Sequence, residues 1–217
     1  MKGRYAMNEF EGKIREQFGG ETFVRVRSVR IGIAGAGGLG SNCAFNLVRS
    51  GFRKFRIIDF DSIDHSNLNR QFYFFDQVGM DKTAALKANL GRINPDVEVE
   101  AVTGKIEREN ILEFFEDCDI VVEALDKAEY KSMLVESLLP TGKFIVSASG
   151  LAGYGRSDDI KVNRIKDNFV IVGDMTSDAS NEPPISPRVN IAAAKQADVI
   201  LEHVIRGAGA SYPAEAS

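Results

Sequence analysis

The feature that most constrains the fold of this chain is a glycine-rich loop between an apolar run and a helix-forming segment. Residues 29–34 form an apolar run that predicts a buried strand, and residues 38–51 carry apolar side chains at helical spacing. The loop between them has the pattern Gly-x-Gly-Gly-x-Gly, formed by Gly35, Gly37, Gly38 and Gly40. Such glycines let the backbone approach a phosphate, and the helix N-terminus favours its negative charge. The loop therefore predicts nucleotide binding.

Downstream of the loop, strands and helices alternate. Strands are predicted at 54–61, 97–102, 119–126 and 143–150, and helices at 79–95, 109–118 and 128–142. Short links between these segments favour crossover connections and therefore parallel strands. We expect an α/β protein of the Rossmann-like, doubly wound class, with a mostly parallel sheet and helices on both faces.

The pattern changes after Gly150. Residues 153–173 contain Gly, Asp and Asn turns between short β runs, which predicts an antiparallel C-terminal extension of the sheet. Residues 174–187 are polar and proline-rich, which predicts a loop. Residues 188–207 then predict an amphipathic helix that ends at Gly207.

Three segments follow from this organisation. Residues 1–28 are expected to form an N-terminal helical segment, with an amphipathic helix over 7–18 and a basic, solvated approach to the first strand over 25–30. Residues 29–207 are expected to form the nucleotide-binding domain, and residues 208–217 a flexible tail.

Charge and hydropathy argue against several classes of partner. The chain has 31 acidic and 27 basic side chains and a net charge of −4, which gives no electrostatic reason to expect nucleic acid or an anionic membrane. No apolar run approaches the roughly 18 residues that a membrane span needs. The N-terminus also lacks the apolar region of a secretory signal. We therefore expect a cytoplasmic protein.

Polar side chains follow the second predicted strand in unusual number. Asp59 lies nineteen residues past Gly40, where a dinucleotide-binding fold places the acid that holds a ribose. This spacing suits an NAD-dependent oxidoreductase, and it equally suits an enzyme that uses ATP on the same scaffold. Hydride transfer does not require Asn67 and Arg70 beside the nucleotide, whereas phosphate chemistry does.

Attack on an α-phosphate builds negative charge on its oxygens and on the departing pyrophosphate. Arg70 can clamp those oxygens with two hydrogen bonds, Asn67 can bind ribose or phosphate, and Lys82 supplies a second cation. Asp126, at the end of a later strand, can hold Mg²⁺ together with phosphate oxygens. Each residue also has a structural interpretation: Asn67 could cap a short helix, and the cations could be surface side chains.

Five stretches of the sequence carry a resemblance to a known family: residues 35–41, 59–71, 78–82, 92–95 and 119–126. Together they resemble the ThiF/MoeB/HesA family, relatives of the ubiquitin-activating enzymes. The resemblance covers Val29 to Gly150 closely and continues more weakly to the last helix. The short chain with few cysteines looks most like a compact ThiF-type member from thiamine biosynthesis.

The resemblance implies an adenylyltransferase that binds ATP and Mg²⁺. Such an enzyme joins the C-terminal Gly-Gly carboxylate of a small ubiquitin-like sulfur carrier to AMP and releases pyrophosphate. The implied nucleotide contacts are Gly37, Gly40, Asp59, Asp61, Asn67, Arg70, Gln71 and Lys82. The resemblance further implies that Asp126 takes the metal and that the protein is a homodimer. Because the attacking carboxylate is already ionised at neutral pH, no general base is needed and the presence of only two histidines is expected.

The sequence also departs from the family pattern. Many relatives hold zinc with two Cys-x-x-Cys pairs, but Cys43 and Cys118 lie 75 positions apart, so no zinc is expected. The loop over 172–187 has no cysteine, so we expect adenylylation only, with sulfur from a separate donor protein. Relatives supply an arginine from the partner subunit's N-terminal segment, and Arg15 is the candidate for that role here.

Other activities remain open within this resemblance. One is activation of a molybdopterin-type or cysteine-pathway carrier. A second is a tRNA-modifying dehydratase that adenylylates a small carboxylate on tRNA, which the net charge of −4 disfavours. A third is a non-catalytic adaptor that only docks a carrier, although such a module would not need the set Arg70, Lys82 and Asp126.

Overall fold

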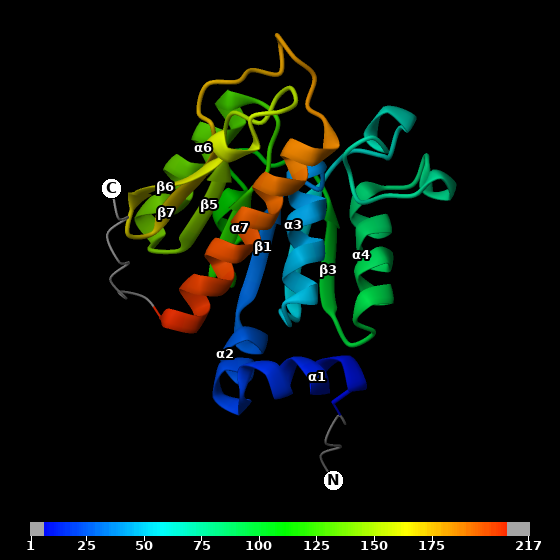
Figure 1. Ribbon diagram of the computed structural model, residues 1–217, viewed down its shortest axis with the longest axis vertical. Helices are drawn as coiled ribbons and strands as arrows, with labels where there is room; N and C mark the ends of the chain where they lie inside the picture. Colours follow the sequence, from blue (N-terminus) through cyan, green and yellow to red (C-terminus); the bar gives the residue numbers. More distant parts are fainter. Residues whose placement is uncertain (1–6, 208–217) are drawn as a thin grey trace.

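Seven strands form one sheet, and helices cover both of its faces (Figure 1). The computed structural model describes residues 7–207. The strand order is β3-β2-β1-β4-β5-β7-β6, and every neighbouring pair is parallel except β6 with β7. The strands are β1 (Arg30–Ala34), β2 (Lys54–Asp59), β3 (Glu98–Thr103), β4 (Ile120–Glu123), β5 (Phe144–Ala148), β6 (Lys161–Lys166) and β7 (Phe169–Gly173). The predicted Rossmann-like fold class is confirmed.

The helices divide between the two faces because the central strands are apolar on both sides. On β4, Val122 packs in the cluster that contains α3, α4 and α7, whereas Val121 packs in the cluster that contains α5 and α6. The helices are α1 (Glu9–Phe18), α2 (Gly20–Ser28), α3 (Gly38–Arg49), α4 (Lys82–Ile93), α5 (Ile111–Phe114), α6 (Ala128–Leu138) and α7 (Ser186–Arg206). No helix within residues 7–207 is long and apolar enough to cross a membrane.

The C-terminal extension is antiparallel, as predicted, but only in its last strand pair. β6 pairs antiparallel with β7, while β7 itself runs parallel to β5. Helix α7 ends at Arg206, directly before the predicted stop at Gly207. The predicted tail over 208–217 lies outside the described residues.

The basic stretch before the first strand belongs to helix α2 as far as Ser28, and this second helix was not predicted; Arg25 and Ser28 are exposed, as a solvated approach over 25–30 implies, but Val26 is buried. Phe23 and Val26 lie three residues apart on α2, and both are buried. This spacing places them on one helix face, which packs on the core. The charges of Arg25 and Arg27, between and beside them, obscured that apolar pair in the sequence.

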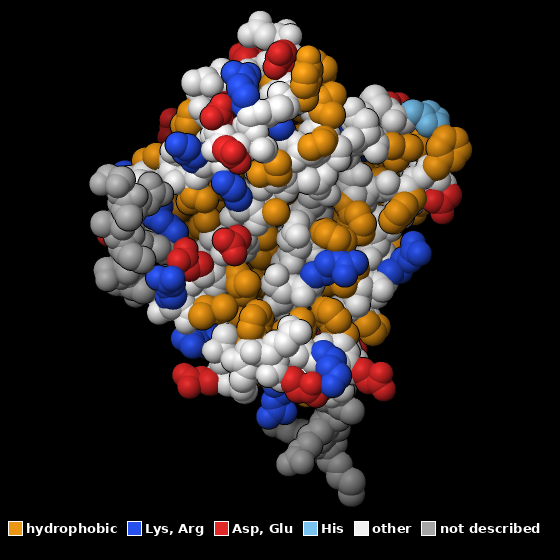
Figure 2. Space-filling model, in the orientation of Figure 1, with side chains coloured by type: hydrophobic (Ala, Val, Ile, Leu, Met, Phe, Trp, Pro, Cys, Tyr) orange, Lys and Arg blue, Asp and Glu red, His pale blue; other side chains and the backbone are white. Residues whose placement is uncertain are grey.

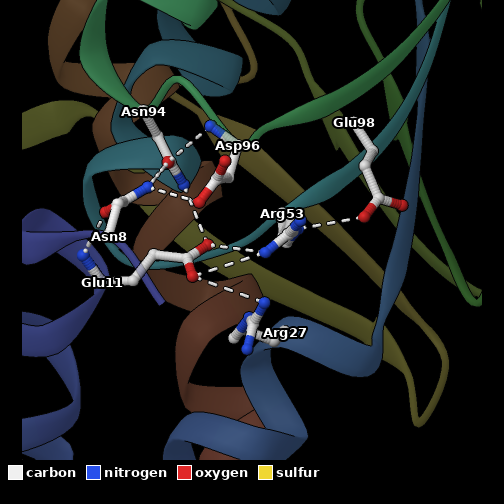
Figure 3. A network of polar contacts seen from close by, with 7 residues as sticks. All are labelled: Asn8, Glu11, Arg27, Arg53, Asn94, Asp96 and Glu98. Atoms are coloured by element: carbon white, nitrogen blue, oxygen red, sulfur yellow. Dashed lines mark hydrogen bonds and ion pairs between the residues drawn. The ribbon is translucent and has the colours of Figure 1, made fainter. Parts of the chain in front are cut away.

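A buried carboxylate fixes α1 and α2 to the sheet (Figure 3). Glu11 is fully buried. Its carboxylate lies 3.4 Å from the Nη2 atom of Arg27 and 3.3 Å from the Nη1 atom of Arg53. The amide of Asn94 donates to the same carboxylate at 3.3 Å. Arg53 lies directly before β2, and Asn94 lies in the link between α4 and β3. Because both residues lie where strands begin, this network places α1 at the amino-terminal edge of the sheet, at the bottom of Figure 1.

Candidate nucleotide-binding site

A cavity of about 300 Å³ opens at the carboxyl ends of the central parallel strands. This is the edge at which open α/β sheets bind ligands. The cavity is lined by seven of the residues predicted from the sequence: Gly35, Asp59, Asp61, Asn67, Arg70, Lys82 and Asp126. The structure therefore brings together side chains that are spread over 92 positions, from Gly35 at the end of β1 to the turn after β4.

The glycine loop needs its glycines for two different reasons. Gly35 has φ of +95°, and a Cβ at this position would lie 2.7 Å from the carbonyl oxygen of Ala124. A Cβ on Gly40 would lie 1.9 Å from the carbonyl oxygen of Gly35. Any side chain at these two positions would push the loop away from β4 or from α3. The loop is thus held close to the turn that carries Asp126.

The carboxylate of Asp59 is tied to the backbone of the loop and of its own strand end. It accepts a hydrogen bond from the Ala36 amide at 2.6 Å and one from the Asp61 amide at 2.8 Å. Burial raises the pKa of Asp59, although these two hydrogen bonds and the nearby Lys82 oppose that rise. Asp59 therefore has a structural role in the loop and also faces the cavity, where the fold places a ribose.

Lys82 is the first residue of α4, and its side chain forms part of the cavity wall. Its ammonium lies 2.7 Å from the carboxylate of Asp61, and its side chain is almost fully buried. The phenol of Tyr73 donates to the Ala36 carbonyl at 2.7 Å and lies 3.2 Å from the Lys82 carbonyl. Tyr73 thereby links the glycine loop to the start of α4.

Asn67 and Arg70 come from the segment between β2 and α4. Asp64 is the N-cap of a short 3₁₀ helix, His65–Asn67, and the Asn67 side chain completes this capping box by accepting from the Asp64 amide at 3.1 Å. Asn67 lines the cavity as well. Arg70 uses its Nη1 atom for the Ser66 carbonyl, at 3.0 Å, and for Asn69, at 2.7 Å. Its Nη2 and Nε atoms make no hydrogen bond within the described part of the chain. That half of the guanidinium remains for a ligand.

Four other predicted residues lie beside the cavity rather than on its wall: Gly37, Gly38, Gly40 and Gln71. Gln71 lies under the loop, with its Nε2 atom 3.9 Å from where a Cβ of Gly37 would be. Its Oε1 atom is buried without a hydrogen-bond partner among the residues described. Because this atom accepts hydrogen bonds, it does not suit a phosphate oxygen. A Cβ on Gly38 would lie 2.9 Å from Val189 of α7, so the first turn of α3 packs against α7.

Arg15 lies far from this chain's own cavity. It belongs to α1, at the opposite edge of the sheet, and lines a small surface depression with its helix neighbours. Arg15 therefore does not contact the site within one chain. Its predicted role in a partner's site stays a prediction.

Sequence reasoning missed three polar residues of the cavity wall: Lys105, Lys127 and Tyr130. The Lys127 ammonium lies 5.5 Å from the centroid of the Tyr130 ring. Lys105 pairs with Glu107 at 3.0 Å, and this hydrogen bond raises the pKa of the lysine. Both lysines lie within four residues of a strand end, β3 or β4, and that position was the available signal.

Asp126 suits Mg²⁺ in its chemistry and in its surroundings. Its carboxylate lines the cavity, and no donor in the described part of the chain bonds to it. Mg²⁺ usually takes one or two carboxylates together with substrate phosphates. Among residues 7–207 there is no group of three or more His, Cys, Asp or Glu that could hold a metal alone. The arrangement fits a metal that arrives with a nucleotide.

The glycine loop, Asp59 and the cations at the carboxyl edge of the parallel sheet define a domain of the Rossmann type. Residues 10–168 match the model of the ThiF family. The chain belongs to the ThiF family, and the resemblance seen in its sequence motifs is confirmed.

Curated relatives are similar to this chain over most of its length. The "SUMO-activating enzyme subunit 2" of Dictyostelium discoideum is 36% identical over 150 residues, which cover 68% of this chain and 22% of the relative. The "Sulfur carrier protein ThiS adenylyltransferase" of Bacillus subtilis (strain 168) is 34% identical over 158 residues, covering 71% of this chain and 46% of the relative. The chain therefore spans less than half the length of either relative.

Solved structures share the fold at lower identity. The E. coli tRNA N6-threonylcarbamoyladenosine dehydratase TcdA, in complex with ATP, has a TM-score of 0.78 at 20% identity, covering 91% of this chain and 92% of that chain. E. coli MccB with ATP has a TM-score of 0.69 at 22% identity, covering 94% of this chain and 65% of that one. These similarities establish the architecture of the domain.

Proposed function

We propose that this protein catalyses ATP-dependent adenylylation of the C-terminal glycine carboxylate of a small ubiquitin-like sulfur carrier. One observation carries the proposal: Arg70, Lys82 and Asp126 converge on the cavity that also contains Asp59 and the glycine loop. Relatives named as a ThiS adenylyltransferase and a SUMO-activating enzyme subunit support it.

The reaction is a displacement at the α-phosphorus of ATP. A carboxylate oxygen of the carrier's last glycine forms a bond to that phosphorus, and the bond to the bridging oxygen of the β-phosphate breaks. The electron pair leaves with pyrophosphate, and the acyl-adenylate remains. Because the nucleophile is already ionised, catalysis rests on positioning and on stabilising the charge that develops on phosphate oxygens.

The residues of the cavity have distinct tasks in this reaction. Arg70 directs its remaining nitrogen atoms at the non-bridging oxygens, and Lys82 exchanges its contact with Asp61 for a phosphate. Asp59 holds the ribose. Mg²⁺, when bound through Asp126, neutralises charge on the triphosphate. Lys105 and Lys127 add positive charge at the cavity wall.

We place the carrier in thiamine biosynthesis, as a ThiS-like protein, because of the relative from Bacillus subtilis. Sulfur then comes from a separate donor protein, since the only cysteines, Cys43 and Cys118, are both buried. Burial raises the pKa of the Cys118 thiol to about 12, so it does not form a reactive thiolate at neutral pH. The cytoplasm is the corresponding compartment.

The homodimer is part of the same proposal, with Arg15 as the residue offered to the partner. Apolar side chains exposed on the face that carries α3 and α7 support it (Figure 2). Phe45 of α3 belongs to an aromatic group whose last member, Phe74, is exposed: the rings of Phe45 and Phe72 lie 4.8 Å apart, and those of Phe72 and Phe74 lie 5.8 Å apart. Sedimentation velocity of the wild-type protein and of Phe74→Glu tests this assembly.

Carrier-dependent exchange of pyrophosphate into ATP tests the proposed activity. The substrate is a thiamine-pathway carrier that ends in Gly-Gly, and the control is the same carrier without its last glycine. Exchange only with the intact tail supports acyl-adenylylation. ATP binding without exchange for any Gly-Gly carrier contradicts the proposal and favours a small-carboxylate substrate or a non-catalytic adaptor.

A further inference from the structure

Glu123 is a fully buried carboxylate directly before the turn that forms part of the cavity wall. It is the last residue of β4 and does not line the cavity itself. Its Oε1 atom accepts from the Leu125 amide at 2.8 Å, and its Oε2 atom accepts from the Ser147 hydroxyl. The Lys131 ammonium lies 3.0 Å from Oε2 and neutralises the charge. The carboxylate thus joins β4, β5, α6 and the turn that follows β4.

That turn, residues 124–127, is part of the cavity wall. All four of its residues line the cavity, and they include Asp126. The Ala124 carbonyl lies against Gly35, where a Cβ would come within 2.7 Å of it. The position of the turn therefore also sets the spacing between Asp126 and the glycine loop.

Asp126 has no hydrogen bond of its own within the part of the chain described here. Its side chain is consequently placed by the backbone of the turn, which is anchored on both sides of Asp126. On one side the Leu125 amide donates to Glu123, and on the other the Lys127 carbonyl accepts from the amides of Tyr130 and Lys131 in α6, each at 3.0 Å. An apolar side chain in place of Glu123 would avoid burying a carboxylate beside Val121 and Val122. The buried charge is therefore expected to serve a purpose other than core packing.

We propose that Glu123 is a positioning residue that holds Asp126 in place for the Mg²⁺–nucleotide complex. It acts through the hydrogen bond from the Leu125 amide, while Lys131 compensates its charge. The inference rests on the proposed function, which gives Asp126 the metal.

A pair of double variants separates the hydrogen bond from the charge. Glu123→Gln with Lys131→Met removes both charges but keeps a carbonyl oxygen for the Leu125 amide and a nitrogen for Ser147. Glu123→Leu with Lys131→Met has nearly the same shape but no acceptor. Glu123→Val with Lys131→Met replaces the leucine variant if that one does not fold, since β-branched residues suit a strand.

Two measurements follow for each variant. Calorimetric titration of ATP, with and without Mg²⁺, gives the factor by which the metal strengthens nucleotide binding. We expect the leucine variant to lower this factor about 10-fold, as loss of a residue that orients a metal ligand typically does, and the glutamine variant to retain it. Hydrogen exchange of the peptide covering 119–130, measured without nucleotide, is expected to be faster only in the leucine variant.

Glu11→Gln is the matched control, because Glu11 is also a fully buried carboxylate, at the opposite edge of the sheet. It is expected to lower stability without changing the factor by which Mg²⁺ strengthens ATP binding. The inference is overturned if the leucine variant keeps wild-type values in both measurements, or if the glutamine variant loses as much as the leucine variant. If wild-type protein shows no metal effect, the proposed role of Asp126 fails, and hydrogen exchange still decides whether Glu123 holds the turn.

Discussion

The Lys82 ammonium lies 2.7 Å from the Asp61 carboxylate, although Lys82 is almost fully buried and Asp61 is half exposed. The backbone joins the same two residues, because the Lys82 amide donates to the Asp61 carbonyl at 3.0 Å. The lysine is thus held at the cavity wall, with its charge compensated on one side only. A triphosphate can replace Asp61 as its partner without moving the helix.

Lys82→Ala is expected to reduce pyrophosphate exchange about 100-fold or more, because it removes a donor aimed at developing negative charge. The free energy of unfolding should change by no more than about 1 kcal/mol, since the Asp61 partner is half exposed. Steady-state exchange and urea unfolding measure the two effects. Lys87→Ala, an exposed lysine on the same helix, is the control and should leave exchange unchanged.

Arg70→Ala should lose most adenylylation and keep the fold, because only its Nη1 atom has protein partners within residues 7–207. Arg70→Lys is expected to restore little of the rate, because a lysine cannot make two parallel hydrogen bonds to phosphate. Exchange rates with saturating carrier provide the comparison. A near wild-type rate in Arg70→Ala would show that the site is assigned incorrectly.

Asp126→Ala should lower exchange at least about 100-fold at physiological Mg²⁺, with partial recovery at high Mg²⁺. Thermal unfolding without ligand should stay near wild type, because no hydrogen bond to this carboxylate is lost. The Mg²⁺ dependence of exchange is the decisive measurement. An unchanged dependence would assign the metal to another residue.

Acid stability should depend on Asp174, which pairs with the buried Arg188 of α7. Burial alone would raise the pKa of Asp174, but amide hydrogen bonds from Ser177 and Thr176, together with Arg188, lower it to about 2. A depressed carboxylate stabilises the fold above its unfolded pKa of about 4 and loses this effect as the pH falls through about 2. Asp174→Asn should remove this pH-dependent contribution to stability. Urea unfolding at pH 7 and pH 3 checks this, and a variant with the wild-type pH profile would refute it.

Glu11→Gln should destabilise the protein by about 3 kcal/mol, because it leaves the cations around a buried site without their counter-charge (Figure 3). Nucleotide affinity should not change, since the network lies at the amino-terminal edge of the sheet. Urea unfolding and ATP titration on the same sample separate these effects. Weakened ATP binding at full folding would indicate that the two edges are coupled.

The convergence of the predicted site residues could be foreseen from the sequence, because it follows from the geometry of parallel sheets. Parallel strands end at one edge, so residues that follow different strands, such as Asp59 and Asp126, meet there. Glu123 could not be found in this way. Its function depends on Ser147 and Lys131, which reach it from neighbouring elements, and such pairing has no local signature. The helix over Gly20–Ser28 was missed because its buried apolar face consists of only two residues, Phe23 and Val26, and the second of them lies between Arg25 and Arg27.

The order of strands β7 and β6 in the sheet also could not be predicted from the sequence pattern. Residues 153–173 show turns and short β runs, but which strand of the extension lies beside β5 depends on packing against α7. The place of Lys105 and Lys127 in the cavity wall was missed for a different reason. Lysines are common on solvated loops, so only the cavity distinguishes these two.

The contact between Val189 and Gly38 has a consequence for biosynthesis. Helix α7 is formed by residues 186–206, and it packs against the first turn of α3, where the nucleotide loop ends. A ribosome makes the glycine loop well before it makes this helix. The loop is therefore without its final support until almost the whole chain described here has left the exit tunnel. Nascent chains that stop before α7 should fail to bind ATP, so the nucleotide can assist only the completed domain.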